Sequence, residues 1–208
     1  MKPVYHSGPK SAKIAFIGEA PGEIEQATGV PFHPKAPAGK ELDRWLHVAG
    51  LTRDEVYIDN VVPVRPSKGS NDFGVFYKVS KQGKFTKGLR WEEFCSCVQQ
   101  LKERLQQVQC NVIVPLGSTA LYALYGTLGE KPDSISKLRG SILDSKLLPG
   151  LKTIPTFHPS PKSQDPKQRF YAMQDVMRAA KDSEYPELKH PDYKWAALWE
   201  RTDVICGS

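Results

Sequence analysis

Cysteine is scarce in this chain, and long apolar runs are absent. The four cysteines, Cys95, Cys97, Cys110 and Cys206, lack the spacing of a usual zinc or disulfide framework, so we expect reduced thiols. No stretch approaches the ~18 consecutive apolar residues of a membrane span. The opening residues, MKPVYHSGPK, contain no apolar signal core. These absences predict a cytoplasmic protein that does not associate with a membrane.

Phosphate-binding signatures are missing as well. The stretch GEAPG at residues 18–22 has neither the GK[ST] ending of a P-loop nor the G-x-G-x-x-G spacing of a dinucleotide site. Nucleotide hydrolysis is therefore not indicated. We find no internal repeat, and a length of 208 residues fits one domain covering 1–208.

Positive charge is concentrated in one segment. The net charge is +6 at pH 7. Between Arg65 and Arg90 the sequence has seven basic residues and one acid, Asp72. Aromatic residues lie among these cations, a pattern that suits nucleic acid because cations pair with phosphates and rings stack on bases. The alternative interpretation is a solvated hairpin. We treat residues 67–90, approximately, as a basic hairpin insertion.

Short apolar runs alternate with segments of helical periodicity. We expect strands at 13–17, 56–58, 111–116, 141–143 and 152–157, and helices at 38–49, 91–108, 118–125 and from Asp165 onward. The last of these helices is expected to bury Phe170, Met173, Val176 and Ala180. A tail from about residue 184 is expected to pack back on the body. This alternation predicts an α/β sandwich with a mostly parallel sheet, in which ligands bind beyond the carboxyl ends of the strands.

Polar and aromatic residues follow several of these strand ends. Glu19 and Glu25 lie in and after GEAPG, Phe32 follows Pro31, Asn60 ends the second strand, and His158 lies in TFHPS. Such a set supplies an aromatic face, an amide, an imidazole and carboxylates, the groups needed to hold a planar heterocycle.

The order of these motifs resembles the uracil-DNA glycosylase superfamily, most closely its family 4 type. The matching stretches are FIGEAPGEIEQATGVPF, AGKELDRWLHVAGLTRDEVYIDNVVPVRP, NVIVPLGSTAL, LRG and IPTFHPS, which run in family order from about residue 13 to 160. The resemblance implies a three-layer α/β/α sandwich with a central, mostly parallel, four-stranded sheet. It also implies a monofunctional DNA glycosylase that flips a nucleotide out of DNA and hydrolyses the N-glycosidic bond of uracil or another modified pyrimidine.

The same resemblance implies roles for individual residues. Phe32 would stack on the flipped pyrimidine, Asn60 would bind its Watson–Crick edge, and His158 would donate to O2 of the departing base. Glu19 or Glu25 would position water and stabilise the cationic sugar, and which of the two does so stays open. Ala20 would line the base pocket. The implied DNA contacts are Pro21, Gly22, Lys35, Ser118, Arg139, Ser160, Lys162 and Gln164.

The chain departs from the family pattern at the cofactor. Family 4 enzymes usually hold an iron–sulfur cluster on four cysteines, one of them in a KCRP motif. Here that motif reads Pro63-Val64-Arg65-Pro66, the N-terminus has no cysteine, and only Cys95 or Cys97 matches a ligand position. One ligand cannot hold a cluster, so we expect no cofactor and no bound metal.

A second departure surrounds the expected DNA-facing mouth. The segment His33-Pro34-Lys35-Ala36-Pro37-Ala38-Gly39 is two residues longer than the family usually has, and its start is polar. With Lys162 it would form a rim that admits a bulky hydrophilic C5 substituent, such as that of glucosylated hydroxymethylcytosine in phage DNA. An antiviral glycosylase for such a base is therefore an alternative, as are neutral loop variation and a catalytically disabled DNA-binding module. For the glycosylase and for the binding module alike, the expected partner is DNA. We expect the protein to be a monomer.

Overall fold

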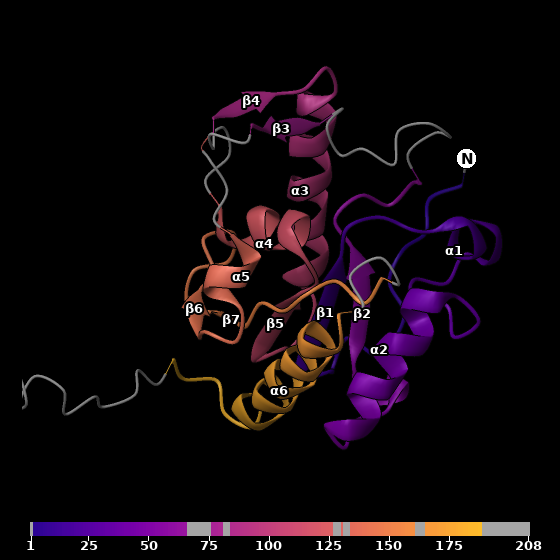
Figure 1. Ribbon diagram of the computed structural model, residues 1–208, viewed down its shortest axis with the longest axis vertical. Helices are drawn as coiled ribbons and strands as arrows, with labels where there is room; N and C mark the ends of the chain where they lie inside the picture. Colours follow the sequence, from indigo (N-terminus) through magenta and orange to yellow (C-terminus); the bar gives the residue numbers. More distant parts are fainter. Residues whose placement is uncertain are drawn as a thin grey trace, which may run out of the picture.

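The structure is a computed structural model that describes residues 2–65, 76–80, 84–126, 130, 134–160 and 165–188. Its central sheet has the strand order β2-β1-β5-β7-β6 (Figure 1). The strands are β1 Ile14–Gly18, β2 Tyr57–Asn60, β5 Val112–Pro115, β6 Leu143–Asp144 and β7 Lys152–Thr153. Neighbouring strands are parallel except for β6, which pairs antiparallel with β7. The expected mostly parallel sheet is confirmed, with five strands rather than four because the short edge strand β6 joins it.

Helices cover both faces of the sheet. They are α1 Glu23–Thr28, α2 Pro37–Val48, α3 Trp91–Leu105, α4 Ser118–Tyr125, α5 Ile135–Leu138 and α6 Pro166–Asp182, with a 3₁₀ helix at Arg53–Glu55. No helix in the described part of the chain is both long and apolar enough to cross a membrane.

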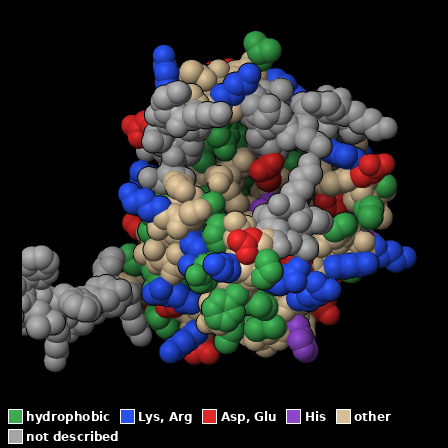
Figure 2. Space-filling view, viewed as in Figure 1, with side chains coloured by type: hydrophobic (Ala, Val, Ile, Leu, Met, Phe, Trp, Pro, Cys, Tyr) green, Lys and Arg blue, Asp and Glu red, His purple; other side chains and the backbone are tan. Residues whose placement is uncertain are grey.

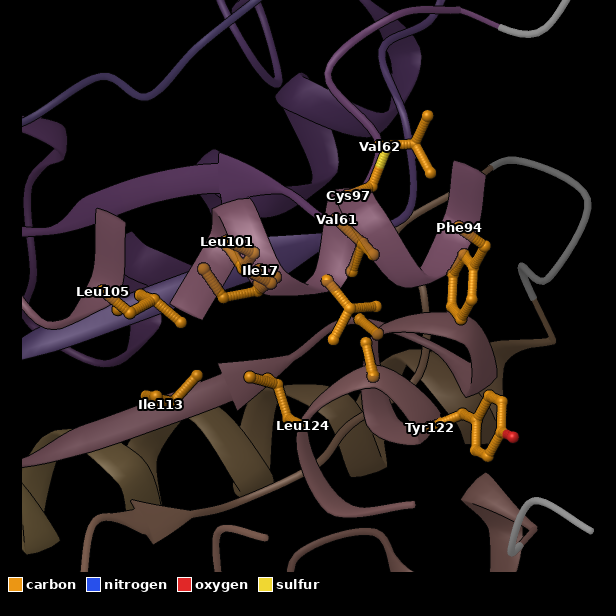
Figure 3. Close-up of a cluster of buried hydrophobic side chains, with 14 of the residues drawn as sticks. Ile17, Val61, Val62, Phe94, Cys97, Leu101, Leu105, Ile113, Tyr122 and Leu124 are labelled. Atoms are coloured by element: carbon orange, nitrogen blue, oxygen red, sulfur yellow. The ribbon is translucent and has the colours of Figure 1, made fainter. Parts of the chain in front are cut away.

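Side-chain alternation along β1 divides the core into two clusters. Ala15 and Ile17 belong to the cluster with α3 and α4, which Figure 3 shows around Ile17 and Leu101. Ile14 and Phe16 belong to the cluster with α2 and α6. Successive strand residues point to opposite faces, so a strand covered on both sides is apolar throughout. This burial on both faces gives the three expected layers.

Helix α6 packs on the sheet largely as its sequence indicated, since Val176 is buried and Met173 and Ala180 pack against the same cluster. Ala172, Val176 and Ala179 are the apolar residues it buries, whereas Phe170 is 55% exposed. The spacing of 172, 176 and 179 follows the helical period as closely as the set that begins at 170. The expected burial of Phe170 is therefore wrong, because small residues let α6 approach the sheet closely.

The basic insertion contains a hairpin in its described part. Strand β3, Tyr77–Val79, pairs antiparallel with β4, Phe85–Lys87. The turn between these strands, at residues 81–83, lies outside the described residues. Residues 66–75 and everything after Leu188, including the expected packing of the tail, also lie outside them.

Candidate active site

Three of the sequence-predicted residues meet where β1 ends. Gly18 pairs in register with Asn60 at the carboxyl ends of β1 and β2. A Cβ atom on Gly18 would lie 2.5 Å from Phe32 Cζ and 2.5 Å from Asn60 Oδ1, so only glycine fits between them. The ring centroids of Phe32 and His158 are 5.9 Å apart, with planes tilted by 39°. The aromatic ring, the amide and the imidazole therefore share one site.

The carboxamide of Asn60 has no partner although it is buried. Asn60 is 1% exposed, and neither Nδ2 nor Oδ1 makes a hydrogen bond. Leaving a buried polar group unpaired costs about 1–3 kcal/mol. The fold tolerates this cost next to an aromatic ring. Asn60 Nδ2 is therefore available to donate to a ligand, and Oδ1 is available to accept from it.

The backbone of Asn60 is held firmly by two residues that the sequence analysis missed. Asp59 Oδ1 accepts a 2.7 Å hydrogen bond from the Asn60 N–H. Arg104 of α3 donates through Nε to Asp59 Oδ2 at 2.7 Å and through Nη2 to the Asn60 carbonyl at 3.2 Å. Asp59 has no exposed surface, so the guanidinium compensates a buried charge. These contacts hold the backbone that carries the amide, while the polar atoms of the side chain stay available.

Phe32 adopts a strained backbone conformation, with φ of +48°. Non-glycine residues seldom occupy this region, and such strain persists only where neighbours impose it. Arg53 supplies one constraint, since it donates through Nη2 to the Phe32 carbonyl and through Nε to Asp43 Oδ1 of α2 at 2.5 Å. Glu25 supplies another, because its carboxylate faces the backbone N–H groups of Phe32 and His33, which help to lower its pKa.

Glu25 is occupied by main-chain donors. The N–H of Gly22, the N-cap residue of α1, donates a hydrogen bond to it. Burial raises the pKa of Glu25 above its ordinary value, and the N–H groups of Gly22, Phe32 and His33 oppose that rise. The carboxylate holds the turn that carries Phe32, which is a positioning task.

Glu19 directly follows β1 and has a different environment. Burial raises its pKa from 4.5 to about 7, and a hydrogen bond with the Thr119 hydroxyl lowers it in part. A carboxyl group whose pKa lies near neutrality is typical of active sites.

The loop that carries His158 is fixed from two sides. Thr156 donates its hydroxyl to Asp175 of α6 at 2.8 Å, and its carbonyl accepts from the Gly117 N–H at 2.9 Å. Gly117, at φ of +89°, lies against the imidazole, where an added Cβ would meet His158 Cβ at 3.0 Å. Burial lowers the pKa of His158 to about 4. At neutral pH the imidazole is therefore uncharged and has one N–H to donate.

A small pocket lies behind this loop. Its lining includes Glu41 and Trp45 of α2, His158 and Ser160 of the loop, and Arg169 of α6. Glu41 accepts from Trp45 Nε1 at 3.0 Å. Arg169 Nε lies 2.6 Å from Glu41 Oε1, close enough for an ion pair although not aligned as a hydrogen bond. These contacts connect α2 and α6 behind His158.

The residues expected to touch DNA fall into different environments. Arg139 donates to Asp175 through both Nε and Nη2, and its guanidinium lies 4.6 Å from the centre of the Tyr171 ring. It therefore supports the His158 loop through Asp175. Pro21 is buried, Ala20, Gly22 and Ser160 are half-buried, Lys35 and Ser118 are exposed, and Lys162 and Gln164 lie outside the described residues.

The face drawn in Figure 2 has a central hollow in which acidic and histidine side chains are visible, while lysines and arginines are spread over the surrounding surface.

The available cysteines do not form a four-ligand set. Cys95 and Cys97 lie on α3 and Cys110 precedes β5, and all three are free thiols. Within the described ranges, no three His, Cys, Asp or Glu side chains are grouped as metal ligands would be. Figure 3 shows Cys97 beside Val62, in the apolar cluster. The described residues therefore do not supply the four ligands that an iron–sulfur cluster needs.

Ordinary polar contacts hold the segment where the cluster motif would lie. The Arg65 N–H donates to Gln26 Oε1 at 2.8 Å, and Arg65 Nη1 pairs with Glu23 Oε2 at 3.1 Å. The Val4 N–H donates to the Pro63 carbonyl at 2.7 Å. These contacts connect residues 63–65 to α1 and to the N-terminal segment.

The fold and site together define an α/β protein in which an aromatic ring, a buried amide and an imidazole lie together beyond the carboxyl ends of the parallel strands. Residues 5–181 match the profile of the Uracil DNA glycosylase superfamily, and the chain belongs to that superfamily. It is similar to the Type-4 uracil-DNA glycosylase of Thermotoga maritima, 34% identical over 178 residues, 85% of this chain and 80% of the relative. The Type-4 uracil-DNA glycosylase of Saccharolobus solfataricus is 30% identical over 174 residues, 82% of this chain and 71% of the relative. That of Archaeoglobus fulgidus is 30% identical over 163 residues, 78% of this chain and 72% of the relative.

Proposed function

We propose that this chain is a single-domain, monofunctional DNA glycosylase that extrudes a nucleotide and hydrolyses the N-glycosidic bond of uracil or another modified pyrimidine. The observation that carries the proposal is the buried, unpaired carboxamide of Asn60 beside the ring of Phe32. A flipped pyrimidine offers the complementary edge and a flat face, and its extrusion costs only a few kcal/mol. Superfamily membership and the names of the similar proteins support this assignment.

Each group has one task in the proposed reaction. Phe32 stacks on the base, which is worth about 1–3 kcal/mol, and Asn60 binds its Watson–Crick edge. As the bond between N1 and C1′ breaks, its electron pair passes to the base, and neutral His158 donates a hydrogen bond to O2, where negative charge collects. Such a preorganised donor is worth about 10²–10³ in rate.

Glu19 is the carboxylate we assign to the sugar and the water. As the carboxylate it stabilises the positive charge on the deoxyribose and orients water. The water adds to C1′ and passes a proton to Glu19, which leaves an abasic site, and the departing pyrimidine anion takes up a proton. Glu25 is assigned the positioning of Phe32, because backbone N–H groups engage its oxygens.

A second class of base is also a candidate substrate. No described residue forms a hydrogen bond with the Asn60 amide, so it presents its oxygen and nitrogen equally well to a 4-oxo or a 4-amino pyrimidine. A cytosine derivative, including the glucosylated hydroxymethylcytosine of phage DNA, is therefore the second candidate substrate.

A base panel tests the proposal. Purified protein is incubated with duplexes that contain uracil, hydroxymethyluracil, hypoxanthine or glucosylated hydroxymethylcytosine, then treated with alkali and resolved on a denaturing gel. We expect strand breaks at one or more pyrimidines, loss of breaks in His158→Ala, and full activity in His47→Ala, which changes an exposed histidine on α2. Absence of breaks on every duplex, with DNA still bound, would indicate the disabled binding module instead.

A further inference from the structure

The described part of the basic insertion, strands β3 and β4, lies near α4 (Figure 1). Tyr77 of β3 packs edge-on against Tyr122 of α4, with ring centroids 5.1 Å apart. Its ring also lies 5.7 Å from that of Phe94 and 5.9 Å from that of Phe85. Aromatic packing of this kind fixes the direction of the phenol.

The phenol points to a hydroxyl that is already connected to the site. Tyr77 Oη is 3.2 Å from Thr119 Oγ1, and Thr119 is buried on α4. The Thr119 hydroxyl in turn makes a hydrogen bond with the Glu19 side chain. A chain of two hydroxyls thus connects the insertion to the turn after β1.

We propose that Tyr77 and Thr119 are positioning residues for Glu19: Thr119 donates to the carboxylate, and Tyr77 donates to Thr119 Oγ1. This inference rests on the proposed function, and it gives the hairpin insertion a part in the chemistry. Hydrogen bonds arranged in a chain polarise one another, so the outer phenol strengthens the bond that the inner hydroxyl makes to Glu19.

The surroundings of Glu19 explain why neutral hydroxyls matter there. Burial is the main influence on its pKa, and no lysine, arginine or histidine among the described residues contributes to that pKa. Tyr77 is the titratable group that interacts electrostatically with Glu19, and Tyr122 acts in turn on Tyr77. Burial also raises the pKa of Tyr77 to about 12, so its hydroxyl stays protonated and can donate at neutral pH. Among the described residues, the Thr119 hydroxyl is therefore the group that favours the ionised carboxylate, and Tyr77 donates to that hydroxyl.

The test measures kcat/KM from pH 5 to 9.5 on the substrate that the unmodified protein cleaves. Thr119→Val removes the donor to Glu19, which should raise the pKa of Glu19 and move the acid limb of the kcat/KM profile to higher pH. Activity should be roughly tenfold lower at pH 7 and should recover near pH 9. Tyr77→Phe keeps the ring packing and should shift the limb the same way with about a threefold loss at pH 7. Thr119→Ser should restore the original profile. Tyr185→Phe, which removes a phenol that donates to Asp182 instead, should leave the profile unchanged.

A second measurement reports on Glu19 without requiring activity. The effect of Glu19→Gln on unfolding free energy is measured against pH with and without Tyr77→Phe. We expect the stabilisation by Glu19→Gln to begin at a higher pH in the protein that also carries Tyr77→Phe. Unchanged profiles and an unchanged midpoint in Tyr77→Phe, or losses that are equal at every pH, would refute the inference. A protein inactive on every base would contradict the proposed function alone, because the unfolding measurement would still decide the role of Tyr77.

Discussion

Replacing Glu19 by glutamine should stabilise the protein at pH 8 while it abolishes catalysis. Burial raises the pKa of Glu19 from 4.5 to about 7, which means that the folded state favours the neutral form. Below pH 4.5 the group is mostly protonated in both states and costs little. As the pH rises through 7, the folded protein must hold a buried carboxylate that the unfolded chain leaves in water.

The size of this effect follows from the two pKa values. At ~1.4 kcal/mol per pKa unit, the difference between 4.5 and about 7 corresponds to about 3 kcal/mol. Glu19 is only half-buried, so solvent screening brings the expected gain at pH 8 to about 2–3 kcal/mol. Glutamine has the same shape and can still accept from Thr119, so packing changes little. The gain should be near zero at pH 4.5.

Urea and thermal unfolding at pH 4.5, 6 and 8 measure this difference. We expect the melting temperature at pH 8 to rise by about 4–12 °C in Glu19→Gln, with little change at pH 4.5. The matched control is Glu103→Gln on the exposed face of α3, which should change stability little at any pH. A Glu19→Gln protein that is less stable at pH 8, or equally stabilised at all three pH values, would show that burial does not control this carboxyl group.

Three further substitutions test other parts of the site. His158→Ala should lower kcat about 10²–10³-fold, and because the pKa of His158 is lowered to about 4, rate profiles of the unmodified protein should show no histidine ionisation between pH 5.5 and 8. Gly18→Ala should cost roughly a hundredfold in kcat/KM with an unchanged circular dichroism spectrum, since its Cβ would displace the Phe32 ring. Arg104→Met should lower the unfolding free energy by about 3–5 kcal/mol in urea titrations by leaving Asp59 buried and uncompensated. Adding Asp59→Asn should recover part of that loss.

The order of the motifs and their resemblance to the superfamily were sufficient to bring Phe32, Asn60 and His158 together as candidates. Asn60 and His158 follow apolar runs, and parallel strands bring such ends to one edge. Phe32 lies in the turn between α1 and α2, so its place beside them came from the resemblance. The groups that hold them were not predictable in this way. Arg104 is 45 residues from Asp59 in sequence, and nothing in either segment indicates that the two side chains pair.

Other residues looked functional in sequence and proved to have contacts that only packing reveals. Arg139 lies in the family-like stretch LRG and was expected to contact DNA, but its guanidinium pairs with Asp175 behind the His158 loop. Glu25 was one of two candidate catalytic carboxylates, and backbone donors from the Phe32 turn occupy it. A side chain's partner depends on which elements lie beside it, which composition and spacing do not record.

The sequence by itself determined the alternation of strands and helices, the loops at the strand ends and the kinds of side chain they carry, because apolar periodicity and turn residues act over short distances along the chain. Tertiary structure decided the chemistry of those side chains. Exclusion of water sets the pKa values of Glu19 and His158, and contacts between distant segments leave the Asn60 amide unpaired while its backbone is held. Desolvation and long-range pairing exist only once the layers have packed, so these properties arise with the fold.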